Sequence, residues 1–158
     1  MAIWQFSVYL IPCSWAEEHE FDSESLFNKD EFSTKSIWDS VQLEDNFQER
    51  IERVLPKAES WSDELLLWGD QEKNDIQIWF KERIDEGILV RIDLRKDPMI
   101  FIREIVQLAQ YLDCAFFFPE LRVISESTET KIIEAIRKSA PFKFVKDPYG
   151  FIEKISKN

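Results

Sequence analysis

The stretch Asn74–Arg95, which reads NDIQIWFKERIDEGILVRIDLR, decides the fold class. Apolar residues take every second position in each half of this stretch, and polar residues take most of the positions between them. A period of two is the pattern of a β-strand with one buried face. The link Asp85-Glu86-Gly87 offers a glycine for the positive φ of a tight turn. We therefore expect two strands joined as an antiparallel hairpin.

Further strands and helices are predicted on both sides of this hairpin. Residues Ile3–Ile11 alternate in the same way and Ala115–Phe118 is a short apolar run, so both predict strands. Apolar residues at helical spacing predict a short helix at Phe47–Leu55. The same spacing predicts a longer helix from Asp97-Pro98 to about Leu112, because Asp and Pro favour the first turn of a helix.

The remaining regions complete the expected layout. Ser127 or Thr128 begins another helix, and the tail is expected to hold a short extended piece at 142–145, a turn at Asp147–Gly150 and a last helical turn. The region around Trp61 and Trp68 is expected to be a connection. We predict an α+β fold in one domain, residues 1–158. Its mostly antiparallel sheet of about four strands is backed by helices, in a β-α-β-β-α-β-like order with an added C-terminal helix.

Charge is the strongest constraint that composition places on partners. The formal net charge is −11 and the pI is about 4.6, so the surface repels phosphate backbones and anionic membranes. We therefore expect no direct binding to nucleic acid or to a membrane. The same field attracts basic protein surfaces and accelerates their encounter. A basic protein partner is the interpretation that fits, with the protein itself a monomer or a weak homodimer.

Cysteine usage and the N-terminal residues bear on the compartment. Cys13 and Cys114 are too few and too far apart to indicate a disulfide framework, and no CxxC pair suggests zinc. Residues 1–6 lack a basic leader, and no apolar run reaches the length of a membrane span. We expect reduced thiols and a cytoplasmic location.

The sequence offers few residues for catalysis. His19 is the only histidine and lies among glutamates, which favours a solvated charged loop over a metal site or a general base. No GxSxG motif is present, and only three glycines are available for phosphate-binding loops. A carboxylate enzyme that uses a divalent cation is the weakest alternative. We therefore predict a protein that is not an enzyme, with no catalytic residue, no metal site and no cofactor.

The acidic segment, residues 14–46, is the most unusual part of the chain. Residues 13–50 hold eleven acids against three bases, so about −8 of the net charge lies there. The aromatic residues between these acids either pack the segment onto the sheet or stand out as anchors in an interface, and both readings stay open. The residues predicted to bind a partner are Trp15, Glu17, Glu18, Glu20, Asp22, Glu24, Asp30, Glu31, Trp38, Asp39, Trp79 and Asp93.

Several short stretches resemble small bacterial immunity proteins of polymorphic toxin systems. They are Trp68-Gly69-Asp70, Asn74–Ile78, Arg91–Arg95, Leu108-Ala109 with Asp113-Cys114, and Phe144–Pro148 with Phe151. The resemblance covers roughly the C-terminal half and the first strand, and it implies a cytoplasmic, acidic inhibitor that obstructs the active site of its toxin. It assigns no contact residue, because such proteins diverge most where they meet the toxin.

Two hypotheses for function follow. The first is an immunity protein that neutralises a cognate toxin, with a nuclease as the first candidate, by covering the basic active-site surface of that toxin. The second is a small-ligand-binding or regulatory module. That module would use the polar sheet face around Trp79, Arg91, Asp93 and Arg95.

Overall fold

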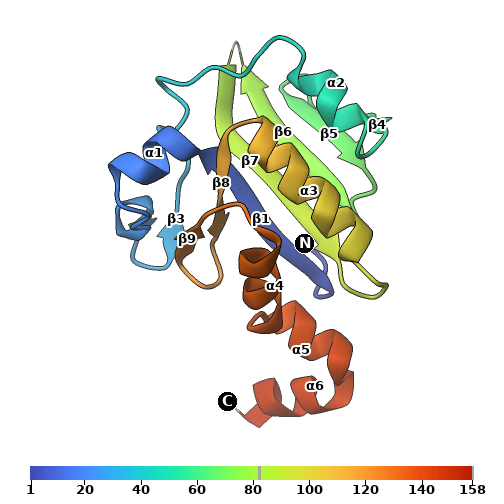
Figure 1. Ribbon diagram of the computed structural model, residues 1–158. Coiled ribbons are helices and arrows are strands. Elements are labelled where there is room, and N and C mark those ends of the chain that lie inside the picture. The colour runs from blue at the N-terminus through green and yellow to red at the C-terminus, as the bar shows by residue number, and fades with distance from the viewer. Residues whose placement is uncertain (82, 158) are drawn as a thin grey trace.

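The structure is a computed structural model that describes residues 1–81 and 83–157. Within these residues the chain has an α+β fold with a seven-stranded antiparallel sheet, a two-stranded sheet and six α-helices (Figure 1). The strands are β1 (Gln5–Pro12), β2 (Phe27–Asn28), β3 (Glu31–Phe32), β4 (Lys57–Ala58), β5 (Leu65–Gly69), β6 (Asp75–Lys81), β7 (Arg83–Asp93), β8 (Cys114–Phe118) and β9 (Val123–Ser125). The helices are α1 (Cys13–Glu18), α2 (Phe47–Glu52), α3 (Met99–Tyr111), α4 (Glu129–Arg137), α5 (Ala140–Lys146) and α6 (Pro148–Lys157).

The large sheet has the strand order β4-β5-β6-β7-β1-β8-β9, and every neighbouring pair is antiparallel. Strand β1 pairs with β7 on one side and with β8 on the other, so the first strand of the chain lies inside the sheet. Phe6 faces Ile92 and Val8 faces Val90 in the β1–β7 register. Both predicted patterns of alternation therefore place their apolar residues on the same face.

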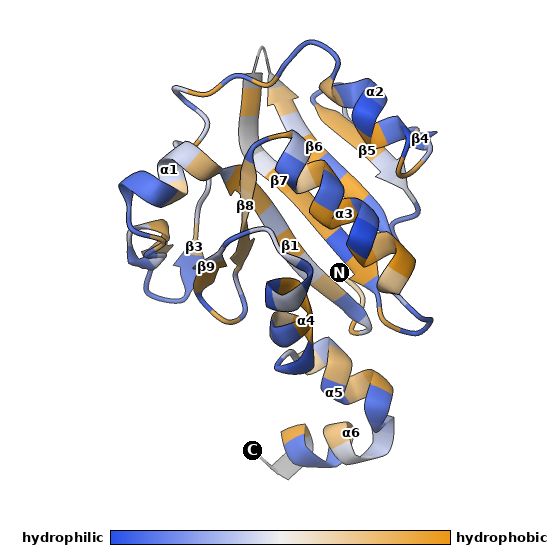
Figure 2. Ribbon diagram, in the orientation of Figure 1, coloured by the Kyte–Doolittle hydropathy of each residue, from blue (hydrophilic) through white to orange (hydrophobic). Residues whose placement is uncertain are grey.

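Helix α3 packs over this apolar face, which we call the covered face of the sheet (Figure 1). Phe6, Val8, Val90 and Ile92 are at most 1% exposed, and they belong to one core cluster with the buried side of α3. Figure 2 shows the matching pattern on the helix, where hydrophobic and hydrophilic residues alternate along its turns. The backbone amide of Met99 donates to the Asp97 carboxylate at the start of this helix, as the Asp-Pro signal predicts.

The opposite face, which we call the open face, carries the odd-numbered residues of β1 and β7. It is not uniformly apolar: Gln5, Asp75, Arg91 and Asp93 lie on it and are buried. Part of the acidic segment covers one region of this face, and a groove occupies another. The open face is therefore where the polar groups of the fold gather.

The structure corrects the predicted number of strands. Residues Leu65–Gly69 form strand β5 where the sequence pattern predicts a connection, and strand β9 is not predicted either. Leu65, Leu67 and Trp68 are all buried, so side chains on successive positions are covered and the alternation that would reveal a strand is absent. The sheet consequently has seven strands in the described chain where about four were expected.

The predicted hairpin turn at Asp85–Gly87 is also wrong. Strand β7 begins at Arg83 and runs through these residues, and the position between β6 and β7, residue 82, lies outside the described residues. Gly87 has φ +91° and sits where the register changes, from Ile78 opposite Ile88 to Phe80 opposite Ile84. The glycine therefore serves an irregularity inside a long strand rather than the turn itself.

The tail is helical where an extended piece was expected. The Ser139 hydroxyl accepts from the backbone amide of Phe142, and Pro141 occupies the first turn of α5. A serine cap followed by proline is a helix start, and it outweighs the alternation of Phe142 and Phe144. Pro148 then begins α6, so the predicted Asp147–Gly150 turn is the start of a second tail helix.

Candidate functional site

The acidic segment is ordered as helix α1, a 3-10 turn at Glu24–Leu26, the β2–β3 hairpin and a loop that leads to α2. All of its predicted contact acids are exposed: Glu17, Glu18, Glu20, Asp22, Glu24, Asp30, Glu31 and Asp39. Asp22 accepts from the amide of Glu24 at 2.9 Å, and Asp30 pairs with Arg122 at 3.2 Å. The segment thus presents its charge to solvent from a folded backbone.

The aromatic rings of the hairpin point the other way, toward the sheet. Phe27 and Phe32 lie opposite each other in the hairpin, and their ring centroids are 5.9 and 5.5 Å from that of the buried Phe117 on β8. Tyr9 on β1 contacts Phe32 edge-on at 5.4 Å. Edge-to-face pairs at these distances are favourable and stabilise the packing. The hairpin is therefore attached to the sheet through rings and exposes carboxylates on its outside.

Trp38 shows the same arrangement further along the segment. It is 1% exposed, and its indole nitrogen lies near Gly87, as does the hydroxyl of Thr34. A Cβ atom at Gly87 would stand only 3.2 Å from that hydroxyl, so the glycine permits this close approach. The Trp38 ring is therefore packed inside the fold, as in the first of the two readings of the aromatic residues, and is not exposed at the surface. Trp15 is half-buried and stacks on His19 at 3.9 Å, so it remains partly accessible.

Arg122, in the β8–β9 turn, ties the segment to the sheet. Its guanidinium donates to the Lys29 carbonyl at 2.8 Å and lies 4.3 Å above the ring of Phe27. The Ser23 hydroxyl donates to the carbonyl of Arg122 at 2.6 Å. Sequence reasoning missed Arg122, because a single arginine between strands carries no signal for a contact more than ninety residues away.

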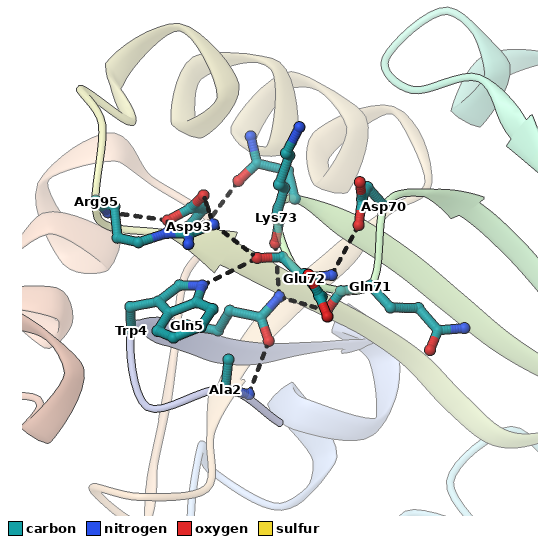
Figure 3. Close-up of polar contacts among 10 residues, drawn as sticks. Ala2, Trp4, Gln5, Asp70, Gln71, Glu72, Lys73, Asp93 and Arg95 are labelled. Carbon is teal, nitrogen blue, oxygen red and sulfur yellow. Dashed lines mark hydrogen bonds and ion pairs between the residues drawn. The ribbon is translucent and has the colours of Figure 1, made fainter.

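Of the two predicted contact residues outside the segment, Asp93 belongs to a polar cluster at one end of the sheet. This cluster consists of Trp4, Gln5, Asp93 and Arg95 with the main chain of the β5–β6 turn, and we call it the latch. It joins the start of β1 to that turn (Figure 3). The Gln5 amide donates to the carbonyls of Gln71 and Lys73, and the Trp4 indole donates to the Glu72 carbonyl at 2.9 Å. The latch therefore fixes the end of the sheet through hydrogen bonds from side chains of β1 and the residue before it to main-chain carbonyls of the β5–β6 turn.

Asp93 and Arg95 complete the latch. Arg95 donates to both oxygens of Asp93 at 3.0 Å and lies over the Trp4 ring at 4.1 Å. Burial alone raises the pKa of Asp93, but hydrogen bonds from Arg95 outweigh it and hold that pKa below its ordinary value. The charges of Asp93 and Arg95 are thus paired with each other within the fold. Trp79, the other residue predicted outside the segment, is half-buried on β6.

Arg91 lies elsewhere on the open face, in a groove of about 810 Å³. Its Nε donates to the Asp75 carboxylate at 2.8 Å, its Nη2 binds the second oxygen, and Gln77 donates to that oxygen at 3.0 Å. Asp75 is fully buried behind Arg91, which itself lines the groove. The predicted polar face is therefore divided: Asp93 and Arg95 are in the latch, and Arg91 is in the groove.

The two thiols are poor nucleophiles. Burial, together with the neighbouring Asp113 carboxylate, raises the pKa of Cys13 to about 11. Burial also raises the pKa of Cys114, which is fully enclosed. Both therefore stay protonated at neutral pH. Among residues 1–81 and 83–157, no cluster of three or more His, Cys, Asp or Glu side chains has the geometry to hold a metal ion.

Comparisons of the chain with protein-family models, curated proteins and solved structures find no match. None of the helices in the described chain combines the length and apolar character needed to cross a bilayer. The fold and its surfaces are therefore the basis for proposing a function.

Proposed function

We propose that this protein is a non-enzymatic inhibitor that binds a cognate toxin, in the first instance a nuclease, and covers its basic active-site surface with the acidic segment. The observation that carries the proposal is that the acidic segment has carboxylates on its outer side and aromatic rings on the side that packs against the sheet. Its eight predicted contact acids face solvent, while Phe27, Phe32 and Trp38 anchor it on the sheet. A charged surface on a rigid base attracts an oppositely charged partner without a large ordering cost on binding.

The uneven distribution of charge along the chain supports a directed encounter. Most of the net charge of −11 lies in residues 13–50, so the field is concentrated on one part of the surface. A nuclease needs a basic cleft to hold its phosphate substrate, and that cleft complements the acidic segment. The resemblance of other stretches of the chain to immunity proteins agrees with this reading, and the raised thiol pKa values agree with a role without covalent chemistry.

The test uses the toxin encoded by the neighbouring gene, purified and immobilised, with this protein in solution. We expect a complex with a Kd below about 1 µM and an association rate that falls as salt is raised. Reversing the charges of Glu17, Glu18 and Glu20 to lysine should slow association by about tenfold or more. No complex, or no protection of cells that express the toxin, would defeat the proposal.

A matched control separates a local surface from net charge. The triple variant Glu126→Lys/Glu134→Lys/Glu153→Lys makes the same change in charge at exposed positions outside the acidic segment. This variant should keep most of the association rate, since local complementarity rather than total charge governs a close encounter. An equal effect of the two triple variants would show that the acidic segment is not the contact surface.

A further inference from the structure

The groove on the open face is a second surface with a defined chemistry, and of the eight exposed contact acids only Asp30 lines it. Its floor is formed by Gln5, Ser7 and Tyr9 of β1 with Leu89 and Arg91 of β7. The β2–β3 hairpin, the β8–β9 turn and the first residues of α5 form its walls. A volume of about 810 Å³ lies in the range of small-molecule sites, roughly 300–1,000 Å³.

The floor holds one oriented hydrogen-bond donor. Arg91 uses Nε and Nη2 on Asp75, and its side chain is 10% exposed. A guanidinium has five N–H groups, so the edge that carries Nη1 and the second Nη2 proton has no partner among the described residues. Asp75 holds the guanidinium plane through two hydrogen bonds, and Gln77 donates to Asp75, which fixes the direction of that edge. Such an edge matches a carboxylate in a bidentate geometry.

The walls are aromatic. Phe27, Phe32 and Tyr9 line the groove, and their rings contact one another edge-on or at a tilt, with centroids 5.4–6.0 Å apart. Phe32 is 36% exposed, so part of its ring surface is available for contact. A planar ring would gain both apolar burial and aromatic contact beside these side chains.

Charges around the groove distinguish it from the rest of this acidic molecule. Arg91 and Arg122 line it, and each is paired with a carboxylate, Arg91 with Asp75 and Arg122 with Asp30. Asp30 pairs with Arg122, and a Glu120 oxygen accepts from the amide of Ala140 at 2.7 Å. The two pairs balance their charges, so a ligand with one negative charge is repelled less here than beside the exposed acids of the acidic segment.

We propose that this groove binds a small planar aromatic carboxylate, with its ring against Phe27, Phe32 and Tyr9 and its carboxylate on the free edge of Arg91. The inference stands apart from the proposed toxin inhibition, since it uses a pocket floor rather than the exposed acids. A site of this kind would let a metabolite act on the protein, because the ligand would contact the hairpin that carries Asp30 and Glu31.

The test measures binding of 2-naphthoate by calorimetry and by changes in backbone NMR signals of the full chain. We expect saturable binding with a Kd of about 1 mM or tighter, and shifts at Ser7 and Leu89. The neutral 2-naphthamide should bind at least about tenfold more weakly, because it lacks the charge that Arg91 recognises. Equal binding of the amide, or no saturation up to about 5 mM naphthoate, would overturn the proposal.

Two variants locate the site. Arg91→Lys keeps a positive charge beside Asp75 but loses the fork, so naphthoate binding should fall by about tenfold while naphthamide binding is unchanged. Phe32→Ala removes part of the wall and should weaken both compounds by about threefold to tenfold. Phe32 is partly exposed, so this variant keeps the test decisive if Arg91→Lys does not fold.

Trp61→Ala is the matched control, because Trp61 is an exposed aromatic residue that does not line the groove. It should leave both affinities unchanged. An effect of Trp61→Ala as large as that of Phe32→Ala would place the compound elsewhere and would contradict the proposal. Naphthoate binding is measured without the toxin, and toxin binding is measured without naphthoate. A failure of one proposal is therefore recognised independently of the other.

Discussion

The two faces of the large sheet are made from the same strands, but different interactions stabilise them. On the covered face, Val8, Val90 and Ile92 meet helix α3 and contribute only apolar packing. On the open face, the neighbouring positions include Asp75 and Arg91, which are buried and depend on each other. The comparison shows that alternation along a strand predicts which face is covered by a helix, but not that the other face is exposed.

The largest expected effect comes from placing one charge on each face in turn. Val90→Asp buries an unpaired carboxylate against α3 and should lower the free energy of unfolding by more than about 4 kcal/mol. Leu89→Asp, one residue away, puts the same group on the half-buried groove floor beside Arg91 and should cost about 1–2 kcal/mol. Urea unfolding followed by tryptophan fluorescence measures both. Equal losses would mean that the two faces do not differ as described.

The next effect concerns the ion pair of the open face. Asp75→Ala leaves Arg91 buried without a counter-charge and should cost about 3–5 kcal/mol. The double variant Asp75→Leu/Arg91→Met replaces both partners by apolar side chains and should lose less stability than the single variant. Urea unfolding of both variants at pH 7 gives the comparison. A double variant as unstable as Asp75→Ala would show that the pair contributes more than the mutual compensation of two buried charges.

The smallest expected effect is the acid dependence of the latch. The pKa of Asp93 is lower in the folded protein than its ordinary value of 3.8, so the folded state favours the carboxylate. Its contribution is present above the ordinary pKa and is lost as the pH falls through the lowered one. Asp93→Asn should therefore flatten the decline in stability below about pH 4. The exposed Asp63→Asn is the control, and an identical acid profile for Asp93→Asn and the parent protein would contradict the assignment.

The sequence predicted the strands with one covered face and the capped helices. Ile3–Ile11, the two halves of Asn74–Arg95 and the Asp97-Pro98 start all correspond to observed elements, because local periodicity and capping determine them. Strand β5 was not predicted, because successive residues in it are buried and the alternation is lost. The hairpin turn was misplaced, because the positive φ of Gly87 belongs to an irregularity within β7. Both errors arise where tertiary packing, rather than local pattern, decides the conformation.

Parts of the candidate site could be predicted in the same way. The exposure of the eight acids follows from their charge, since charged carboxylates are rarely found in the core. The sequence could not show that Trp38 and Phe27 would pack against the sheet, because their contacts, Gly87 and Phe117, are distant in sequence. The division of Arg91 from Asp93 and Arg95 was equally hidden, since it depends on the β5–β6 turn reaching across to β1.

The outermost strands of the large sheet are also its shortest. Strand β4 has two residues, Lys57–Ala58, and strand β9 has three, Val123–Ser125. An outer strand exposes unpaired backbone amides and carbonyls, and a long one invites a second molecule to extend the sheet. Short edge strands, one of which carries a lysine, leave few backbone groups with which another strand could pair. A chain that is one-seventh aromatic is thereby protected at its sheet borders against growth into fibres.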